Sequence, residues 1–521
     1  MEKINYQKKI KTFINRHWFG IFVILIITLS IFLRFYNYEN RWALASDQAR
    51  DALVGREALG QHKIPIIGPF SSAGVFVTGP QWYWLIALAT SIYPGYVLMP
   101  WIALTLSFVL AVYIMILIGT EISGKLFGLI LGLLTAVSPS QIAQSTNLTN
   151  PSAVVIFSVL SVYFCLRYIK TGRSFSIFLF TFFISLSINM HFQSIGLLIM
   201  IPIALFMRKP KMKQLAYLMG GLIIPFIPLI IFDLNNGLYN TRGIIDYYLY
   251  GQYRIYVRNR WLTYALVYWP SAWSHIIGGP KEFGYFIILL LTSFVFYFGV
   301  IKRAISKQIL LFILSFACIF LILRYYRGER FDAYILFTHP FVITLTGWVI
   351  YNLYNFKKYI GLALLLLILA GSLTQNAQLI KNSTNQTALT ASNWKDKLIR
   401  VYPNRKFSVY DLKGENKSLS LPLSLFLDVD DKISNNGIKI GFIVEDKEKV
   451  KYPAVIEMGG GYQLFDLSKF DKNYLLKEGW FIMNPEAIYH STEEWYVGKK
   501  LNTFWDGSVA LWSLIKNRFT N

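Results

Sequence analysis

The chain has 521 residues, of which 55% are hydrophobic, 17% aromatic and only 15% charged. Soluble proteins carry roughly a quarter charged residues, so this composition excludes a soluble enzyme, a disordered chain and a collagen-like fibre. The net charge is +23, but eleven of the 28 acidic residues lie in residues 1–380 and seventeen in 381–521. The positive excess therefore belongs to an apolar region, which favours a polytopic membrane protein with a hydrophilic tail over a nucleic-acid-binding protein.

Eleven apolar runs approach the roughly 20 residues that a membrane-spanning helix needs. They lie near residues 18–36, 97–119, 126–141, 152–168, 174–190, 192–207, 214–233, 283–301, 308–324, 331–354 and 359–375. The first run follows a basic leader and ends without a small-residue cleavage site, so we expect an uncleaved anchor and not a removed signal peptide.

Residues 81–93 form a further apolar segment, but as a helix it covers only about 20 Å and is too short to span. If it does not span, the basic clusters at 125, 167–173, 208–213, 302–307 and 357–358 all fall on the side of the N-terminus, as the positive-inside rule favours. We therefore expect a multi-pass protein of the plasma membrane with a cytoplasmic N-terminus. The outer face would carry loops 37–96 and 234–282 and the C-terminal tail, with 81–93 lying in the outer interface.

The tail alternates apolar and polar residues over 406–410, 438–444 and 452–456, which predicts strands. The expected organisation is a transmembrane domain over 1–380 and an extracytoplasmic domain over 381–521. The expected fold is mainly α, with about eleven transmembrane helices and a small α/β or β-rich C-terminal domain.

The apolar runs contain almost no ionisable residues, which disfavours an ion-coupled transporter. Polar side chains gather instead at the predicted outer ends of the runs. Among them are Asp47, Asp51, Asn147, Asn150, His191 and Gln193. This distribution indicates a site at the outer face, reached both from outside and from the lipid.

Asp47 stands where the outer loop 37–96 enters a helical pattern over residues 52–59. Aspartate is a favoured helix N-cap, so a purely structural role is one interpretation. A carboxylate at the outer face that acts on a substrate is the other.

Several short motifs follow one another in order along residues 1–375. They are Asp47-Gln48-Ala49-Arg50, Gly79-Pro80 with the aromatic segment after it, Gly124-Lys125-Leu126-Phe127-Gly128, Ser138-Pro139, Asn150-Pro151, His191-Phe192-Gln193 and Phe232-Asp233-Leu234-Asn235-Asn236-Gly237. In this order the sequence resembles the C-type-fold membrane glycosyltransferases that use polyprenyl-phosphate sugars. The nearest groups are the aminoarabinose transferases and protein O-mannosyltransferases of glycosyltransferase family 39. The resemblance does not cover the tail.

The resemblance implies that Asp47 is the catalytic carboxylate, which accepts a proton from an acceptor hydroxyl as it attacks the sugar's anomeric carbon. It also implies the partners, namely a polyprenyl-phosphate-linked sugar and an extracytoplasmic glycan, lipid or protein acceptor. The leaving lipid phosphate requires cationic stabilisation, for which outer arginines are suited.

The sequence departs from this family at the positions where relatives carry a second acidic residue. Gln48 stands where many relatives carry glutamate, and Asn147 and Asn150 stand in a region where some carry another acid. A divalent metal is therefore doubtful, no metal ligand is assigned, and the cofactor is unknown. Thr78 replaces a lysine of the aminoarabinose branch, so phosphate binding must use other cations.

Ten residues are predicted to bind substrate. Two clusters are arginine-rich. The cluster in loop 234–282 could instead belong to an interfacial helix that contacts lipid headgroups. The cluster in the turn 324–330 could instead extend its charged groups from helix ends towards water. Arg50 could pair with Asp47 or reach phosphate, and His191 is more often a hydrogen-bonding residue than a metal ligand. The ten are Arg50, Asp51, His191, Gln193, Arg242, Arg254, Arg258, Arg324, Arg327 and Arg330.

The sequence thus predicts a membrane glycosyltransferase. Two alternatives stay open at this point: an oligosaccharyltransferase-like or polymerase-like relative, and a lipid-linked glycan flippase or transporter. The absence of a Trp-Trp-Asp-Tyr-Gly-type motif in the tail disfavours an oligosaccharyltransferase.

Overall fold

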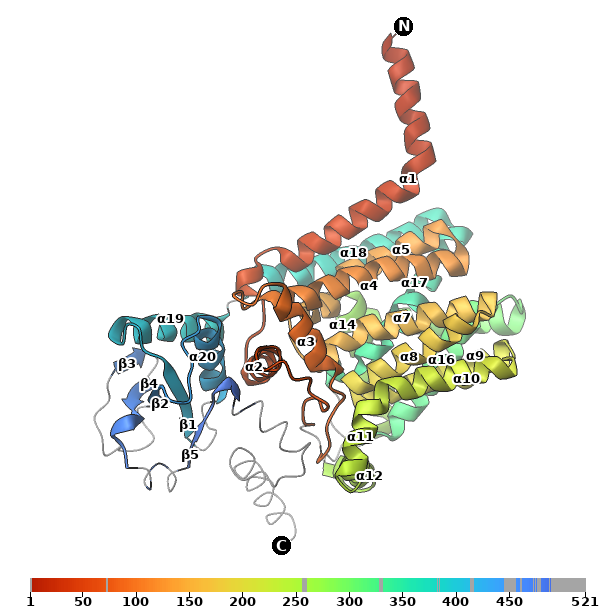
Figure 1. The fold of residues 1–521 in the computed structure, drawn as a ribbon. Coiled ribbons are helices and arrows are strands. Elements are labelled where there is room, and N and C mark those ends of the chain that lie inside the picture. Colours follow the sequence, from red (N-terminus) through yellow and green to blue (C-terminus); the bar gives the residue numbers. More distant parts are fainter. Residues whose placement is uncertain are drawn as a thin grey trace.

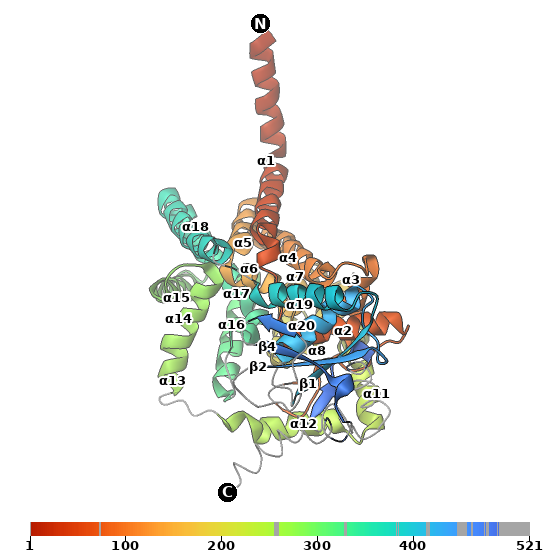
Figure 2. The same cartoon turned by 90° about the vertical axis from the view of Figure 1, so that its left-hand side faces the viewer.

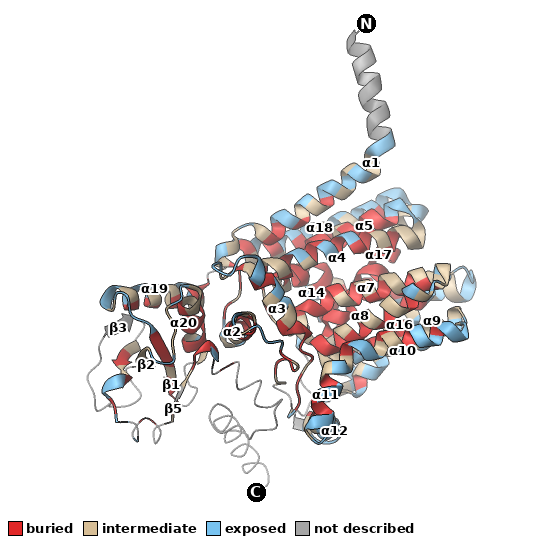
Figure 3. Ribbon diagram, viewed as in Figure 1, coloured by how far each residue is buried: buried red, intermediate tan, exposed pale blue. Residues whose placement is uncertain are grey.

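The computed structural model describes residues 2–71, 74–254, 260–327, 331–381, 383, 385–412, 417–444, 456–459, 462–471, 473, 475, 479–486 and 488. A bundle of long helices is joined at one end by a smaller unit of helices and strands from the tail (Figure 1). Buried residues concentrate in the middle of the bundle, and exposed ones line its outer helices (Figure 3).

Each predicted apolar run lies on one helix or on two or three adjoining helices. These are α1 (Glu2–Phe35), α4 (Met99–Ser123), α5 (Lys125–Val137) with α6 (Pro139–Ser145), α7 (Asn150–Thr171), α8 (Ser174–Met190), η2 (Phe192–Ile199) with α9 (Met200–Met207), α10 (Met212–Ile223) with η3 (Ile224–Phe226) and α11 (Ile227–Asn235), α15 (Lys281–Phe296) with η6 (Tyr297–Ile301), α16 (Lys307–Tyr325), η7 (Asp332–Thr338) with α17 (His339–Phe356), and α18 (Lys358–Lys381).

Eight of the helices in the described part of the chain are long and apolar enough to cross a membrane, or nine if the bent pair α5–α6 is one span. Helix α8 and the η2–α9 segment are apolar but shorter than the others. The prediction of a mainly helical, multi-pass membrane protein is confirmed. Segment 81–93 is helix α3 (Gln81–Ile92), whose 12 residues are too few to span.

Loop 234–282 differs from the expectation of an outer loop because much of it is helical. It contains α12 (Tyr239–Leu249), η4 (Gly251–Arg254), α13 (Arg260–Leu262), η5 (Thr263–Tyr268) and α14 (Trp269–Ile277). Trp269 and Trp273 are buried, and the Trp273 indole donates to the Thr346 hydroxyl on α17 at 2.9 Å. Tryptophan carries a large apolar surface with one polar handle, so these two residues anchor α14 in the bundle.

The bundle helices α5 and α6 meet at an angle of 57° near Ser138. A helix end leaves carbonyls without partners, and side chains from other helices supply donors here. The buried guanidinium of Arg34 donates to the carbonyls of Ala136 at 3.0 Å and Thr135 at 3.4 Å, and the Asn376 amide donates to Val137 at 2.8 Å. The bend is therefore held by α1 and α18.

Basic connections gather at the end of the bundle away from the tail. Glu121 accepts from Arg167 and Lys170, at the close of α4 and α7, and Arg208 donates to the carbonyls of Ile169 and Lys170. The tail unit lies at the opposite end, where α1 finishes and α2 (Ser46–Gly60) begins (Figure 1).

In the described part of the tail, a five-stranded sheet packs with helices, so the predicted α/β or β-rich character is confirmed. The strand order is β3-β4-β2-β1-β5, with β1 (Phe407–Leu412) parallel to β2 (Ile438–Val444) and the other neighbours antiparallel. The tail also contains β3 (Ile456–Gly459), β4 (Tyr462–Asp466), β5 (Trp480–Ile482), α19 (Gln386–Val401), α20 (Lys417–Val429) and the short η8 (Leu467–Lys469). The short η1 (Tyr38–Asn40) lies between α1 and α2. Of the predicted strand 452–456, only Ile456 lies within the described residues.

Replacing Arg34 by Met removes the donors that satisfy the carbonyls at the end of α5. We expect the free energy of unfolding to fall by about 2–3 kcal/mol, because charge-assisted hydrogen bonds are lost and buried carbonyls are left unpaired. Thermal unfolding of the detergent-purified protein measures the change. Ile31→Met is the control, since Ile31 is 41% exposed on the same helix. Equal melting of the two variants would contradict this role.

Candidate functional site

The start of α2 carries the predicted catalytic carboxylate. The N-cap position is Ala45, whose backbone N–H donates to the side-chain oxygen of Gln48 at 3.0 Å. The N-cap interpretation of Asp47 is therefore wrong. The Asp47 side chain is 68% exposed and accepts one hydrogen bond, from Arg50 at 2.9 Å, which leaves most of the carboxylate open to solvent.

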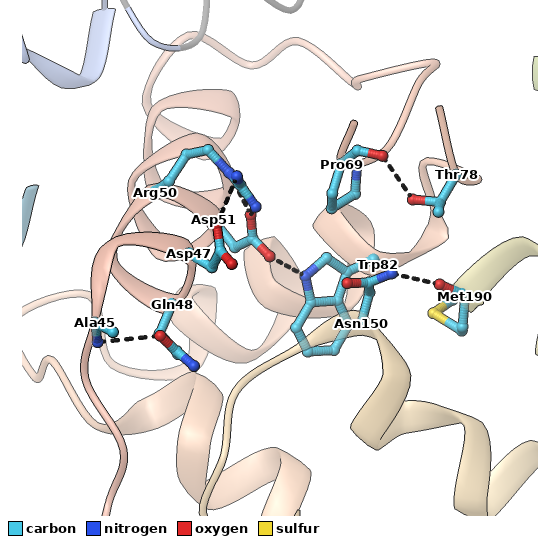
Figure 4. A network of polar contacts seen from close by, with 10 residues as sticks. All are labelled: Ala45, Asp47, Gln48, Arg50, Asp51, Pro69, Thr78, Trp82, Asn150 and Met190. Carbon is cyan, nitrogen blue, oxygen red and sulfur yellow. Dashed lines mark hydrogen bonds and ion pairs between the residues drawn. The ribbon is translucent and has the colours of Figure 1, made fainter. Parts of the chain in front are cut away.

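A partly exposed arginine, Arg50, forms an ion pair with the buried Asp51 next to Asp47 (Figure 4). Arg50 Nε and Nη2 donate to one oxygen of Asp51, at 2.9 and 2.7 Å, and the Trp82 indole donates to the other at 2.7 Å. Asp51 is only 1% exposed. Burial acts against the charged guanidinium, but the nearby Asp51 and Asp47 carboxylates outweigh it and raise the pKa of Arg50. Arg50 is thus a fixed cation between a buried and an exposed carboxylate.

Helices α2 and α3 approach closely enough to make this geometry possible. A Cβ on Gly55 would lie 2.4 Å from the Ile86 side chain, so the glycine is required at this contact. Tyr83, in the same turn of α3 as Trp82, is fully buried and hydrogen-bonded to Arg50. Burial raises the pKa of the Tyr83 phenol, which keeps it neutral beside the ion pair.

Two amide side chains beside the site, Gln48 and Asn147, bond to each other. The Gln48 amide donates to the Asn147 side-chain oxygen at 2.8 Å, which ties α2 to the segment before α7. Divalent cations such as Mg²⁺ and Ca²⁺ favour carboxylate-rich oxygen sites, and this paired set of neutral amides does not fit one. Over the described ranges, no group of three His, Cys, Asp or Glu side chains is placed to hold a metal ion.

The tail contributes a residue that the sequence analysis missed. Helix α20 packs against α2, and the view from the tail side shows the tail unit lying over α2 (Figure 2). Lys417, the first residue of α20, lies within electrostatic range of Asp411, Arg50 and Asp47, and burial lowers the pKa of its ammonium group. Near the other end of the same helix, Asp428 accepts from Arg56 Nε at 2.6 Å. Opposite charges on α2 and α20 therefore lie near each other at both ends of α20.

His191 and Gln193 lie in a second, aromatic cluster. The His191 ring stacks on Tyr334 with centroids 4.7 Å apart, and burial lowers the pKa of the imidazole to about 4. Gln193 hydrogen-bonds to Tyr326, whose hydroxyl is 2.6 Å from that of Tyr247. At neutral pH His191 is thus an uncharged, stacked ring.

Hydrogen bonds link the end of α8, beside this cluster, to α7 and to the segment before α3. The Asn150 side-chain amide donates to the Met190 carbonyl at 2.6 Å, next to His191 (Figure 4). Gly79, just before α3, donates its N–H to the Asn189 carbonyl at 2.7 Å. The end of α8 therefore meets the start of α3.

The structure places the arginines that were predicted to bind substrate in different surroundings. Arg324 is buried with its guanidinium 3.5 Å from the Trp261 ring centroid, and Arg327 lies 4.9 Å from that of Tyr253, so both are engaged with aromatic rings. Arg242 is exposed on α12. Arg254 ends η4 and its side chain is outside the described part. Arg258 and Arg330 also lie outside the described residues.

No protein-family model and no curated protein sequence matches the chain. Among solved structures, its fold is similar to that of ArnT from Cupriavidus metallidurans in the apo state. The TM-score is 0.56 at 10% sequence identity, covering 86% of this chain and 98% of that chain. The same protein bound to undecaprenyl phosphate gives a TM-score of 0.55 at 12% identity, covering 85% and 97%. This similarity confirms the predicted C-type fold.

A more distant similarity is to the oligosaccharyltransferase AglB from Archaeoglobus fulgidus in complex with an inhibitory peptide and a dolichol-phosphate. It covers 82% of this chain and 70% of that chain at 12% identity, with a TM-score of 0.46. A likeness at that level carries no argument about this chain.

A double-mutant cycle of Arg56→Ala and Asp428→Ala tests the contact between α2 and α20. These side chains are 13% and 21% exposed, so we expect a coupling free energy of about 1 kcal/mol or more from thermal unfolding. The control pair is Lys406 and Asp431, which are 46% and 89% exposed and should couple by less than about 0.3 kcal/mol. Equal coupling in the two cycles would refute a specific contact.

The lowered pKa of His191 predicts that the free energy of unfolding depends on pH. Its folded-state pKa is below the ordinary value of about 6.5, so its contribution is present above that pH and is lost as the pH falls towards 4. The expected loss is about 3 kcal/mol. His191→Phe keeps a ring against Tyr334 and should flatten this part of the pH profile of unfolding. An unchanged profile in the variant would show that another group titrates.

Proposed function

We propose that the protein is a membrane glycosyltransferase that moves a sugar from a polyprenyl-phosphate donor to an extracytoplasmic acceptor. The observation that carries this proposal is an open carboxylate, Asp47, paired with Arg50, which is itself anchored on the buried Asp51. It lies where the helical bundle meets the tail. The shared fold with ArnT, which has been solved with undecaprenyl phosphate, supports a donor of this class.

In this reaction Asp47 acts as the general base. The acceptor hydroxyl gives its proton to the carboxylate while its oxygen bonds to the anomeric carbon, and the bond from that carbon to the phosphate oxygen breaks. A hydroxyl is a weak nucleophile at neutral pH, so a placed carboxylate accelerates its attack. The single hydrogen bond from Arg50 orients Asp47 and leaves lone pairs for the substrate proton.

The leaving phosphate needs nearby positive charge and no proton. It is one bond from the anomeric carbon, so its cations must lie beside Asp47. Arg50 bonds Asp47 directly, and Lys417 is within electrostatic range of both. These two residues suit the phosphate better than Arg324 and Arg327, which are engaged with aromatic rings. The C-terminal domain, residues 381–521, would then complete the site through Lys417.

The proposed orientation follows from the charge pattern. The basic connections around Arg167, Lys170 and Arg208 would be cytoplasmic, together with the N-terminus, in the plasma membrane. Helix α2 and the C-terminal domain would face outward, where the acceptor is an envelope glycan, lipid or protein.

Replacing Asp47 by Asn tests the function. Transfer from synthetic undecaprenyl-phosphate sugars, measured by mass spectrometry of the products in proteoliposomes, should fall by about 10²–10⁴-fold. Binding of the lipid donor should persist, because the cations remain. Asp246→Asn is the control, since Asp246 is an exposed acid on α12, and it should retain activity. Full transfer by the Asp47 variant would refute the mechanism and favour a carrier.

A further inference from the structure

Helix α3 carries two tryptophans whose indole N–H groups donate over the same distance to different acceptors. Trp82 donates to the Asp51 carboxylate at 2.7 Å, and Trp84 donates to the Pro65 carbonyl at 2.7 Å. Trp82 is 2% exposed and Asp51 is 1% exposed. A hydrogen bond to an ionised acceptor is stronger than one to a neutral carbonyl, and more so where water is excluded. The Trp82 bond is therefore the stronger of the two, and its acceptor belongs to the candidate site.

The two carboxylates at the start of α2 share one guanidinium (Figure 4). Arg50 donates from Nε and Nη2 to one oxygen of Asp51, at 2.9 and 2.7 Å, and from Nη1 to one oxygen of Asp47 at 2.9 Å. The Trp82 indole occupies the second oxygen of Asp51. Because an arginine can meet a single carboxylate with two parallel bonds, Asp47 and Asp51 compete for the donors of Arg50.

The state of Asp51 decides this competition. Burial raises the pKa of Asp51, and the bonds from Arg50 and Trp82 act against that rise. The indole bond therefore favours the ionised form, which is the form that attracts the guanidinium. The other titratable side chains that act on this pair, among the described residues, are Asp47 from α2, Tyr83 from α3 and, beside Arg50, Lys417 from α20.

The present division of donors leaves part of Asp47 free. Asp47 accepts one bond, from Nη1 of Arg50, and its second oxygen accepts none from a described residue. If Arg50 turned fully to Asp47, two parallel bonds would occupy both oxygens and reduce the lone pairs open to a proton. The free oxygen of Asp47 thus depends on how firmly Asp51 holds Arg50.

We propose that Trp82 is a positioning residue, whose indole bond holds Asp51 as the main partner of Arg50 and so keeps one oxygen of Asp47 free for the acceptor hydroxyl. The inference rests on the proposed function for the use of that oxygen. The division of Arg50 between the two carboxylates is a property of the protein alone, so it can be measured without turnover.

The test labels exposed carboxyl groups of the full-length protein in detergent with a carbodiimide and glycine ethyl ester, and mass spectrometry measures the label on Asp47. Trp82→Phe removes the indole donor and keeps a ring. We expect Arg50 to turn towards Asp47 and the labelling of Asp47 to fall about threefold or more. Trp84→Phe is the matched control and should leave the labelling unchanged, because its indole bonds a backbone carbonyl. Equal labelling of Asp47 in the two variants would overturn the proposal.

Asp51→Asn tests the same relay from its other side. It keeps the indole and removes the charge that holds Arg50, so labelling of Asp47 should fall as it does in Trp82→Phe. This variant answers the question even if Trp82→Phe fails to fold. Adding Trp82→Phe to Asp51→Asn should cause no further fall, because both changes act through one carboxylate. A second fall of equal size would show that Trp82 acts by packing alone, and would overturn the proposal.

Transfer kinetics supply the functional readout. In Trp82→Phe we expect kcat to fall about tenfold with the KM of the lipid donor changed by less than about twofold, because a misplaced base slows the chemical step. The acid limb of the pH profile should also move to higher pH, since Asp51 loses a bond that lowers its pKa. A purely structural role would not move this limb, and an unmoved limb would contradict the proposal.

The two readouts separate this inference from the proposed function. Reduced labelling of Asp47 in Trp82→Phe, in a protein without any transfer activity, would support the positioning role and refute the transferase. Transfer that is lost in Asp47→Asn but is equal in Trp82→Phe and Trp84→Phe would support the transferase, and the positioning role of Trp82 would fail alone.

Discussion

The site depends on one buried carboxylate, Asp51. Burying a charge is costly unless it is paired and hydrogen-bonded, and here Arg50 and the Trp82 indole satisfy both oxygens. The pairing fixes α2 against α3 and leaves the Arg50 guanidinium with a donor to spare for Asp47. The exposed carboxylate is thus held by an arginine that is anchored on the buried Asp51, and a general base must be positioned in this way.

Much of the fold could be predicted from the sequence, because apolar length and the distribution of basic residues are local signals. The eleven apolar runs are helical, and strands at 407–412 and 438–444 lie where alternation placed them. Helix α14 could not be found in this way. Its burial depends on the Trp273 contact with Thr346, 73 residues away, and on the surrounding helices.

The candidate site was only partly predictable for the same reason. Asp47 and Arg50 are close in sequence, whereas the Asp51–Trp82 bond and the Gln48–Asn147 pair join distant segments. Lys417 comes from a tail that the family resemblance does not cover, and only the packing of α20 on α2 brings it near. Arg324 and Arg327 were predicted for phosphate from their charge, but aromatic rings that sequence spacing does not reveal lie against them.

The start of α3 connects two chemically different surroundings. The Trp82 indole on α3 supports the charged cluster around Asp47, and an apolar cavity of about 340 Å³ lies on the side of Gly79 and Asn189. A cryo-electron microscopy structure of the full chain with undecaprenyl phosphate tests this account most directly. The account predicts the phosphate within about 3–5 Å of Arg50 or Lys417, on the side of Asp47. A phosphate bound at the basic end near Arg167 and Arg208 would contradict it.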